Sequence, residues 1–355
     1  MMDAPRSSSR TVQALRVAAA AAIALIVSEW WHLPHTNLAV WTTHMVMSSH
    51  PHTAFQKGVE RIAGRGAGIL LGTLIVSLFG AQKLLALGLE VVGLLAFFYA
   101  HFCGRLAYTY QNAGLYLQAM FQLGDGDPSA AWVNGGWMFL AIVVGVAVAS
   151  LVTWITNAER DLSIVPGEGS LLPIRGEPLG HAAQVTATML LAQYVFFALD
   201  MPPDANIYSL FMISVIPDFQ KMRERTGYFV GGILAGIAYA VPSLLLLNRV
   251  LHLPMFVALV GLGEFLSSYL AQSKGNIKFV GIEMGTIFPL IMVLPYEKIL
   301  TPSMTFYNII ALFTYTLLAV VVGWVWVAVG LVPARLAEPA GSPARNTEPA
   351  SIRTS

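Results

Sequence analysis

The stretch KGVERIAGRGAGILLG, from Lys57 to Gly72, decides how the chain is organised, because a related stretch, KMRERTGYFVGGILAG, runs from Lys221 to Gly236. The two stretches match at several positions when they are aligned at one constant offset. The matching residues of the first stretch are Lys57, Glu60, Arg61, Gly68, Ile69, Leu70 and Gly72. Their counterparts in the second stretch are Lys221, Glu224, Arg225, Gly232, Ile233, Leu234 and Gly236. So many matches over so short a length indicate an internal duplication. In both copies a charged helical turn leads into a glycine-rich apolar helix. This order is typical of a segment that enters a membrane and packs closely on a neighbour.

The composition predicts an integral membrane protein. Of the 355 residues, 56% are hydrophobic and only 11% are charged, and the mean hydropathy is +0.66. A soluble surface normally needs about 25% charged residues. The apolar runs are about 18–25 residues long, as spanning helices require, and lack the alternation of barrel strands. The first run has no small-residue cleavage site, so we expect no signal peptide.

The apolar runs predict an all-α polytopic membrane protein with about twelve transmembrane segments in two parallel six-helix repeats. The first repeat, residues 11–157, has segments at 11–31, 38–49, 55–79, 84–103, 106–123 and 132–157. The second repeat, residues 179–332, has segments at 179–199, 206–217, 221–247, 251–271, 277–295 and 304–330. The second segment of each repeat is short, and so is 106–123. A cytoplasmic linker is expected at 158–178, with disordered tails at 1–10 and 333–355.

Positive charge predicts the orientation of these segments. If the N-terminus is cytoplasmic, only Lys83, Arg249 and Lys298 fall in outer turns, and the remaining Lys and Arg residues collect in inner loops and tails. This asymmetry is what the positive-inside rule requires, so we expect both termini in the cytoplasm. Because each repeat has an even number of segments, the repeats share one orientation and are related by an axis along the membrane normal.

The basic residues of the repeated stretch lie on one helical face. Arg61 and Arg65 are four residues apart, and Arg225 repeats the first of them. One interpretation is a pair of cationic collars at the inner mouth that attract anionic solutes. The alternative is a set of positive-inside anchors, partly neutralised by Glu60 and Glu224.

Glycines in the two copies form small-xxx-small ridges. They are Gly64, Gly68 and Gly72 in the first copy and Gly227 and Gly231 in the second. Such ridges allow close packing of helices, which is the role we expect here. A glycine hinge is the alternative.

Two acidic residues, Glu264 and Glu283, fall deep in apolar segments. A carboxylate at this depth costs about 2.5 kcal/mol or more, so it must face a partner or a wet cavity. We regard both as candidate proton-coupling residues. The alternative is a static pair with a lysine or with a hydroxyl such as Ser267 or Thr286. Glu90 is expected nearer the outer interface.

The segment 106–123 is unusually polar and aromatic for a membrane span. Tyr108, Gln111, Asn112 and Gln118 could line a cavity for a ring-bearing or carboxylate solute. Hydrogen bonding between helices would explain the same residues without a ligand.

No motif indicates an enzyme or a cofactor. His44, His50, His52 and His101 have no metal-binding spacing, and the single Cys103 can form neither an internal disulfide nor a cysteine cluster. The chain lacks a nucleotide-binding loop and the hydrolase motifs, so transport energy would have to come from an ion gradient. The net charge of +1 gives no sign of nucleic-acid binding, and we expect none.

A further pattern joins these features: Trp41 and Thr42 precede Pro51, and Arg61 and the glycines at 64, 68 and 72 follow. The second copy retains Pro217, Arg225, Gly227 and Gly231 without a Trp-Thr pair. In this pattern the chain resembles the fusaric-acid-resistance-like and aromatic acid exporter superfamily over most of residues 11–330.

This resemblance implies a function. It implies a bacterial inner-membrane efflux permease that exports small aromatic or other organic acids, driven by the proton motive force. The expected partners are the lipid bilayer, the organic-acid substrate, a periplasmic membrane-fusion adaptor and an outer-membrane channel. Similar plant malate channels imply one alternative, a passive organic-anion channel. A non-transporting membrane subunit that anchors an adaptor is another.

Overall fold

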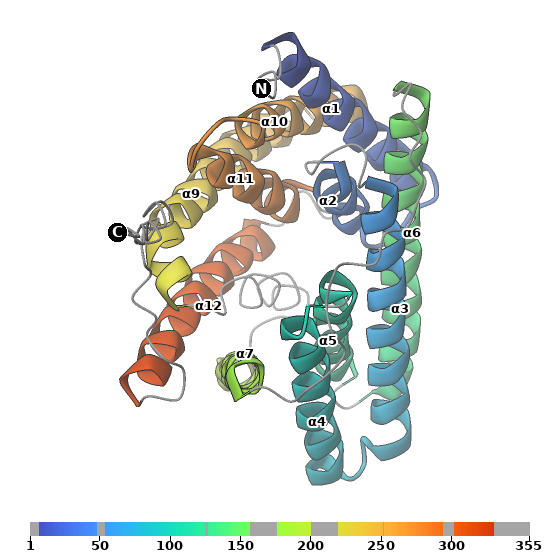
Figure 1. The fold of residues 1–355 in the computed structure, drawn as a ribbon. Coiled ribbons are helices and arrows are strands. Elements are labelled where there is room, and N and C mark those ends of the chain that lie inside the picture. Colours follow the sequence, from blue (N-terminus) through green and yellow to red (C-terminus); the bar gives the residue numbers. More distant parts are fainter. Residues whose placement is uncertain are drawn as a thin grey trace, which may run out of the picture.

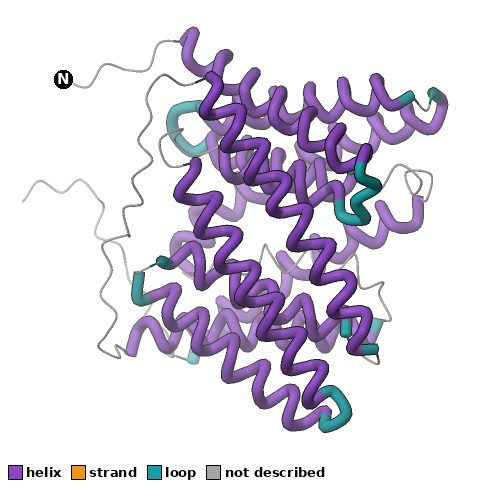
Figure 2. The backbone as a smooth tube through the Cα atoms, turned by 90° about the vertical axis from the view of Figure 1, so that its right-hand side faces the viewer, coloured by secondary structure: helices purple, strands orange, loops and turns teal. Residues whose placement is uncertain are grey.

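The computed structural model describes residues 7–47, 54–104, 106–124, 127–156, 176–199, 219–250, 252–293 and 302–329. Every regular element in these residues is an α-helix (Figures 1 and 2). The helices are α1 (Ser7–Trp30), α2 (Thr36–Met47), α3 (Ala54–Phe79), α4 (Lys83–Phe102), α5 (Ala107–Leu123), α6 (Pro128–Thr156), α7 (Gly176–Ala198), α9 (Phe219–Arg249), α10 (Leu253–Ala271), α11 (Ile277–Met292) and α12 (Pro302–Ala328). The predicted segment 206–217 and the predicted tail 333–355 lie outside the described residues, and so does most of the linker.

The helix bounds lie close to the predicted ones, with corrections at three starts. Helix α1 begins within the predicted tail 1–10, and α7 begins within the predicted linker 158–178. The first turn of α1 is held by α10, because Arg10 Nε donates to the Gln272 carbonyl at 2.8 Å. The Arg10 guanidinium also lies 5.9 Å from the centre of the Tyr269 ring. Tertiary contacts of this kind order residues whose composition alone suggests a flexible tail.

Helix α6 begins four residues before its predicted start. Asp127 caps it, since Asp127 Oδ1 accepts hydrogen bonds from the Ser129 hydroxyl at 2.6 Å and from the Ser129 backbone N–H at 2.9 Å. These bonds hold the pKa of Asp127 below its usual value. Pro128 suits the first helical position, because its missing N–H would have no partner there.

The protein is a multi-pass membrane protein. Among the described residues, 6 helices are long and apolar enough to cross a bilayer, at Arg10–Trp30, Phe55–Phe79, Lys83–Phe102, Pro128–Thr156, Val230–Arg249 and Leu253–Ala271. Large apolar side chains such as Leu84, which is 88% exposed, point away from the protein as lipid-facing residues do. The predicted count of twelve spans stays a prediction. Helix α2 is short, as predicted for the segment 38–49; its 12 residues are about 18 Å long, less than the hydrocarbon core of about 30 Å.

The helices pack in corresponding pairs. Helix α3 packs along α5, and α9 packs along α11; likewise α4 packs on α5, and α10 packs on α11. The first helix of each predicted repeat packs on the other repeat, since α1 contacts α10 and α7 contacts α4. Figure 1 shows α2 between α11 and the α3–α6 pair, and α2 contacts all three helices.

Glycines make the two closest helix pairs possible. A Cβ added at Gly64 would overlap the Thr109 carbonyl oxygen, and one added at Gly68 would overlap that of Ala113. At Gly72 it would lie 2.7 Å from the Leu117 carbonyl oxygen. The backbones of α3 and α5 therefore touch along this ridge.

The packing glycines of α9 are not those predicted. A Cβ at Gly227 would meet open space, and at Gly231 it would meet only Val280, at 3.8 Å. The glycines that contact α11 are Gly232, where a Cβ would overlap that of Glu283, and Gly236. Because one residue turns a helix by about 100°, the ridge at 227 and 231 lies to one side of the closest contact with α11, which runs through Gly232 and Gly236.

Candidate anion site and an adjoining histidine–glutamate pair

Two arginines of α3 are buried inside the helical bundle. Arg61 is 1% exposed and Arg65 is 0% exposed. The predicted shared face is present, but it forms no open collar, because α2 and α5 enclose both guanidiniums. Burying an arginine is unfavourable unless aromatic rings or hydrogen-bond acceptors replace water.

The surroundings of the arginines supply both kinds of contact. Arg65 Nε donates to Asn112 Oδ1 at 3.0 Å, and its Nη1 donates to Thr42 Oγ1 at 3.3 Å. Arg61 Nη1 donates to the Tyr108 hydroxyl. The Trp41 ring centre lies 4.3 Å from the Arg61 guanidinium carbon and 4.6 Å from that of Arg65. The Tyr116 ring centre lies 4.7 Å from the Arg65 guanidinium carbon. We call the set Trp41, Thr42, Arg61, Arg65, Tyr108, Asn112 and Tyr116 the arginine site.

The guanidinium of Arg61 retains unused hydrogen-bonding capacity. Its Nε and Nη2 atoms are buried and have no hydrogen-bond partner within the described residues. Glu60, the predicted neutralising residue, accepts a hydrogen bond from Gln56 Nε2 at 2.8 Å. Nε and one Nη of a guanidinium form the fork that binds a carboxylate through two parallel hydrogen bonds. Arg61 can therefore receive an anion.

Helix α5 brings only part of its predicted polar set to the arginine site. Tyr108 and Asn112 contact the arginines, and Asn112 Nδ2 also donates to the Tyr108 carbonyl at 2.7 Å. Gln111 is half-buried. Gln118 instead connects α5 to α7, through bonds to the Met189 carbonyl and to Gln193 Oε1. For Gln118 the contacts agree with the alternative of hydrogen bonding between helices.

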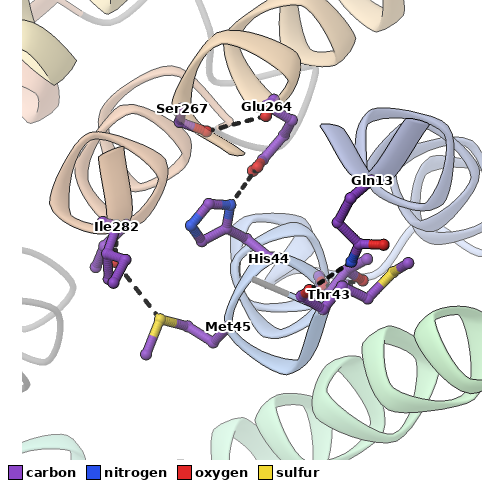
Figure 3. A network of polar contacts seen from close by, with 10 residues as sticks. Gln13, Thr43, His44, Met45, Glu264, Ser267 and Ile282 are labelled. Atoms are coloured by element: carbon purple, nitrogen blue, oxygen red, sulfur yellow. Dashed lines mark hydrogen bonds and ion pairs between the residues drawn. The ribbon is translucent and has the colours of Figure 1, made fainter. Parts of the chain in front are cut away.

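A second polar pair lies on another side of α2 (Figure 3). His44 Nδ1 and Glu264 Oε2 are 2.6 Å apart, and both side chains are 0% exposed. The predicted hydroxyl partner, Ser267, donates to the backbone carbonyl of Glu264 at 3.1 Å. The sequence predicted Glu264 as a site residue but missed His44. The sequence could have indicated His44, because it is a histidine inside a short apolar segment. The residues around it do not indicate which helix it contacts.

Helix α11 makes room for the imidazole of His44. A Cβ added at Gly285 would overlap the His44 ring. Four residues further on, Pro289 has no N–H to donate to the Gly285 carbonyl, so the helical ladder is interrupted beside the ring.

Glu283, the other predicted proton-coupling residue, faces α9. Glu283 is 9% exposed, and its Cβ faces Gly232 of α9. The Thr286 hydroxyl donates to the Ile282 carbonyl at 2.9 Å and lies 3.6 Å from Met45 Sδ. The side chain of Arg225 lies outside the described residues. No group of three or more His, Cys, Asp or Glu residues in the described part of the chain could hold a metal ion.

A cavity of about 560 Å³ lies near the end of α3, between α4, α5 and α7. Glu90, Gln193, Phe121, Phe197 and Lys83 are among its lining residues. Glu90 is only 1% exposed, so it is more deeply enclosed than its predicted place near the outer interface suggests.

Comparison with known proteins agrees with the resemblance seen in the sequence. Residues 22–152 match the family described as fusaric acid resistance protein-like. The chain is similar to that family over this part of its length. No curated protein and no solved structure matches the chain. The matched residues include the whole arginine site and His44, whereas Glu264 lies outside the match.

Proposed function

We propose that the protein is a membrane permease for small organic anions, and that Arg61 and Arg65 bind the carboxylate of the solute. The observation that supports this most directly is the buried Arg61 guanidinium with two nitrogen atoms unpartnered in the described residues. A buried positive charge is stabilised by an anion, and the Nε–Nη2 edge matches a carboxylate. The description of the matching family, as resistance protein-like, agrees with an export role.

The finer features of this function remain predictions. We expect export across the bacterial inner membrane, with both termini cytoplasmic and with aromatic acids among the solutes. The proton motive force would supply the energy, with Glu264 or Glu283 as the proton-carrying residue. An adaptor and an outer-membrane channel would continue the path across the periplasm. We further propose that the two helical repeats arose by duplication, in agreement with the corresponding pairs α3–α5 and α9–α11.

The test is binding and flux of benzoate with the full chain in lipid nanodiscs and proteoliposomes. Arg61→Gln removes the charged fork, and charge-assisted hydrogen bonds contribute about 1.5–3 kcal/mol, so we expect about 10- to 100-fold weaker binding. Arg16→Gln is the matched control, because Arg16 donates to the Thr156 carbonyl, away from the arginine site. Neutral benzamide should not compete. Equal benzoate affinity in Arg61→Gln and the unaltered protein would disprove the assignment.

The two alternatives give different results in the same preparation. A passive channel would carry benzoate at a rate that an uncoupler leaves unchanged. An anchoring subunit would show no flux alone and would recover an adaptor on purification.

A further inference from the structure

The His44–Glu264 pair is a polar contact between the two predicted repeats, enclosed by apolar helices. His44 belongs to α2 and Glu264 to α10, 220 residues apart in the chain. Each side chain also has one polar atom, His44 Nε2 and Glu264 Oε1, with no hydrogen-bond partner in the described residues. The pair therefore has a place for an additional proton on either side chain.

The protonation state of this pair sets its net charge. With a neutral imidazole that donates Nδ1–H to the Glu264 carboxylate, the pair carries one negative charge. One proton from water makes the pair neutral overall, whichever side chain holds it. In a buried environment such a change of charge acts over a longer distance than it would in water.

Helix α2 connects the pair to the arginine site. Trp41 and Thr42, which contact the two arginines, lie within one helical turn of His44. All three side chains are buried. A Cβ at Gly145 of α6 would lie 2.5 Å from the Ala39 carbonyl oxygen and 2.9 Å from Thr42 Cβ, so α2 is closely packed on its far side as well.

We propose that the His44–Glu264 pair is a proton-binding site linked through α2 to the arginine site, so that a proton and an organic anion bind together. This inference rests on the proposed function. A deprotonated pair adds a negative charge close to the anion and weakens its binding, and a proton removes that charge. Conversely, a bound anion offsets the arginine charges and favours proton uptake by the pair.

Other charged and titratable groups on the helices packed around the pair have contacts of their own. Arg10 and Arg16 of α1 donate to backbone carbonyls, and Tyr239 of α9 donates to the Leu259 carbonyl. On α11, Lys278 is exposed over Phe279, and Glu283 faces Gly232. The described residues of α6 carry no charged side chain. Arg61 and Arg65 are thus the buried charges that the pair influences through α2.

The sign of this linkage gives the pair a particular role. A proton that binds together with the anion is not the counter-ion that exchanges for it. The pair instead increases anion loading when the proton concentration rises, as happens where weak acids accumulate. Glu283 then remains the predicted residue for proton exchange.

The test is calorimetric binding of benzoate and of malate to the full chain in nanodiscs, between about pH 5.5 and about pH 8.5, where both probes are anionic. Inside a protein, a unit charge changes an ion-binding constant about tenfold at a separation of about 10 Å, and we expect the affinity of the unaltered protein to fall by an amount of this order as the pH rises. The Glu264→Gln variant should bind the anion at every pH tested with the affinity that the unaltered protein has at low pH. Glu90→Gln changes another buried carboxylate, on α4, which packs mainly on α5 and α7, and this variant should keep the pH dependence. When the titration is repeated in buffers of different ionisation enthalpy, the measured binding enthalpies should show that the unaltered protein takes up a proton on anion binding and that Glu264→Gln does not.

The outcomes separate this inference from the proposed function. An unchanged pH dependence in Glu264→Gln, or proton release on anion binding, would overturn the linkage while leaving the anion site intact. His44→Gln should move the pH at which affinity changes, and an unmoved midpoint would remove His44 from the site. Failure of the unaltered protein to bind either probe at any pH would remove the proposed function, and this inference with it.

Discussion

At the scale of single residues, Trp41 is the centre of the arginine site. Its ring lies against both guanidiniums, which are like charges one helical turn apart and therefore repel each other. The negative face of an indole ring attracts a cation, by up to about 2 kcal/mol when water is excluded. The ring thus stabilises two buried positive charges beside each other.

Replacement of Trp41 by leucine should destabilise the protein. Trp41→Leu removes the ring from both arginines and leaves unfilled space, so we expect a loss of about 2–4 kcal/mol, seen as a lower midpoint in thermal unfolding followed by circular dichroism. Trp41→Phe keeps an aromatic face and should lose less. If both variants have the same unfolding midpoint as the unaltered protein, the ring contacts do not stabilise the arginines. Benzoate should raise the midpoint of Trp41→Leu, because the anion supplies the missing negative potential.

At the scale of elements, the glycine ridge of α3 determines how close α5 can approach. The carbonyl oxygens of Thr109 and Ala113 occupy the space that a side chain would need. This approach brings Tyr108 and Asn112 within hydrogen-bonding distance of the arginines. Helix packing and the anion site therefore depend on the same contact.

A single methyl group on this ridge should separate α3 from α5. Gly68→Ala places a Cβ against the Ala113 backbone, which cannot move as a side chain can, so we expect destabilisation by about 1–3 kcal/mol and weaker benzoate binding. Gly136→Ala on α6 is the matched control, since its Cβ meets nothing within 4 Å and alanine favours a helix by about 1 kcal/mol. Thermal unfolding of the two variants should shift in opposite directions. A Gly68→Ala protein as stable as Gly136→Ala would show that the ridge does not pack as described.

The sequence predicted where the helices begin and end better than it predicted which face of each helix contacts which neighbour. Apolar length and charged turns are local properties, so the bounds of α3 and α5 lie within a residue of those predicted. The burial of Arg65 and the meeting of His44 with Glu264 depend on which helices become neighbours, and no local pattern specifies that. The packing glycines of α9 could have been found, because Gly232 and Gly236 match Gly68 and Gly72 in the repeated stretch.

At the scale of the whole molecule, the packing of α1 on α10 and of α7 on α4 joins the two predicted repeats. If the repeats are parallel, corresponding turns lie on the same side of the membrane. The turn between α4 and α5 then corresponds to the turn between α10 and α11. The charge distribution predicts both turns in the cytoplasm.

Cysteine labelling can test this arrangement with little alteration of the protein. Cys103, the single cysteine, ends α4 and is partly exposed, so a membrane-impermeant maleimide should reach it only after cells are permeabilised. Ser273→Cys, placed in the α10–α11 turn of a Cys103→Ser protein, should behave in the same way. Ala81→Cys in that background lies in the turn between α3 and α4 and should be labelled in intact cells. Labelling of Cys103 and Ser273→Cys from opposite sides would rule out parallel repeats. The prediction that both copies of the basic stretch begin on the cytoplasmic side would then fail as well.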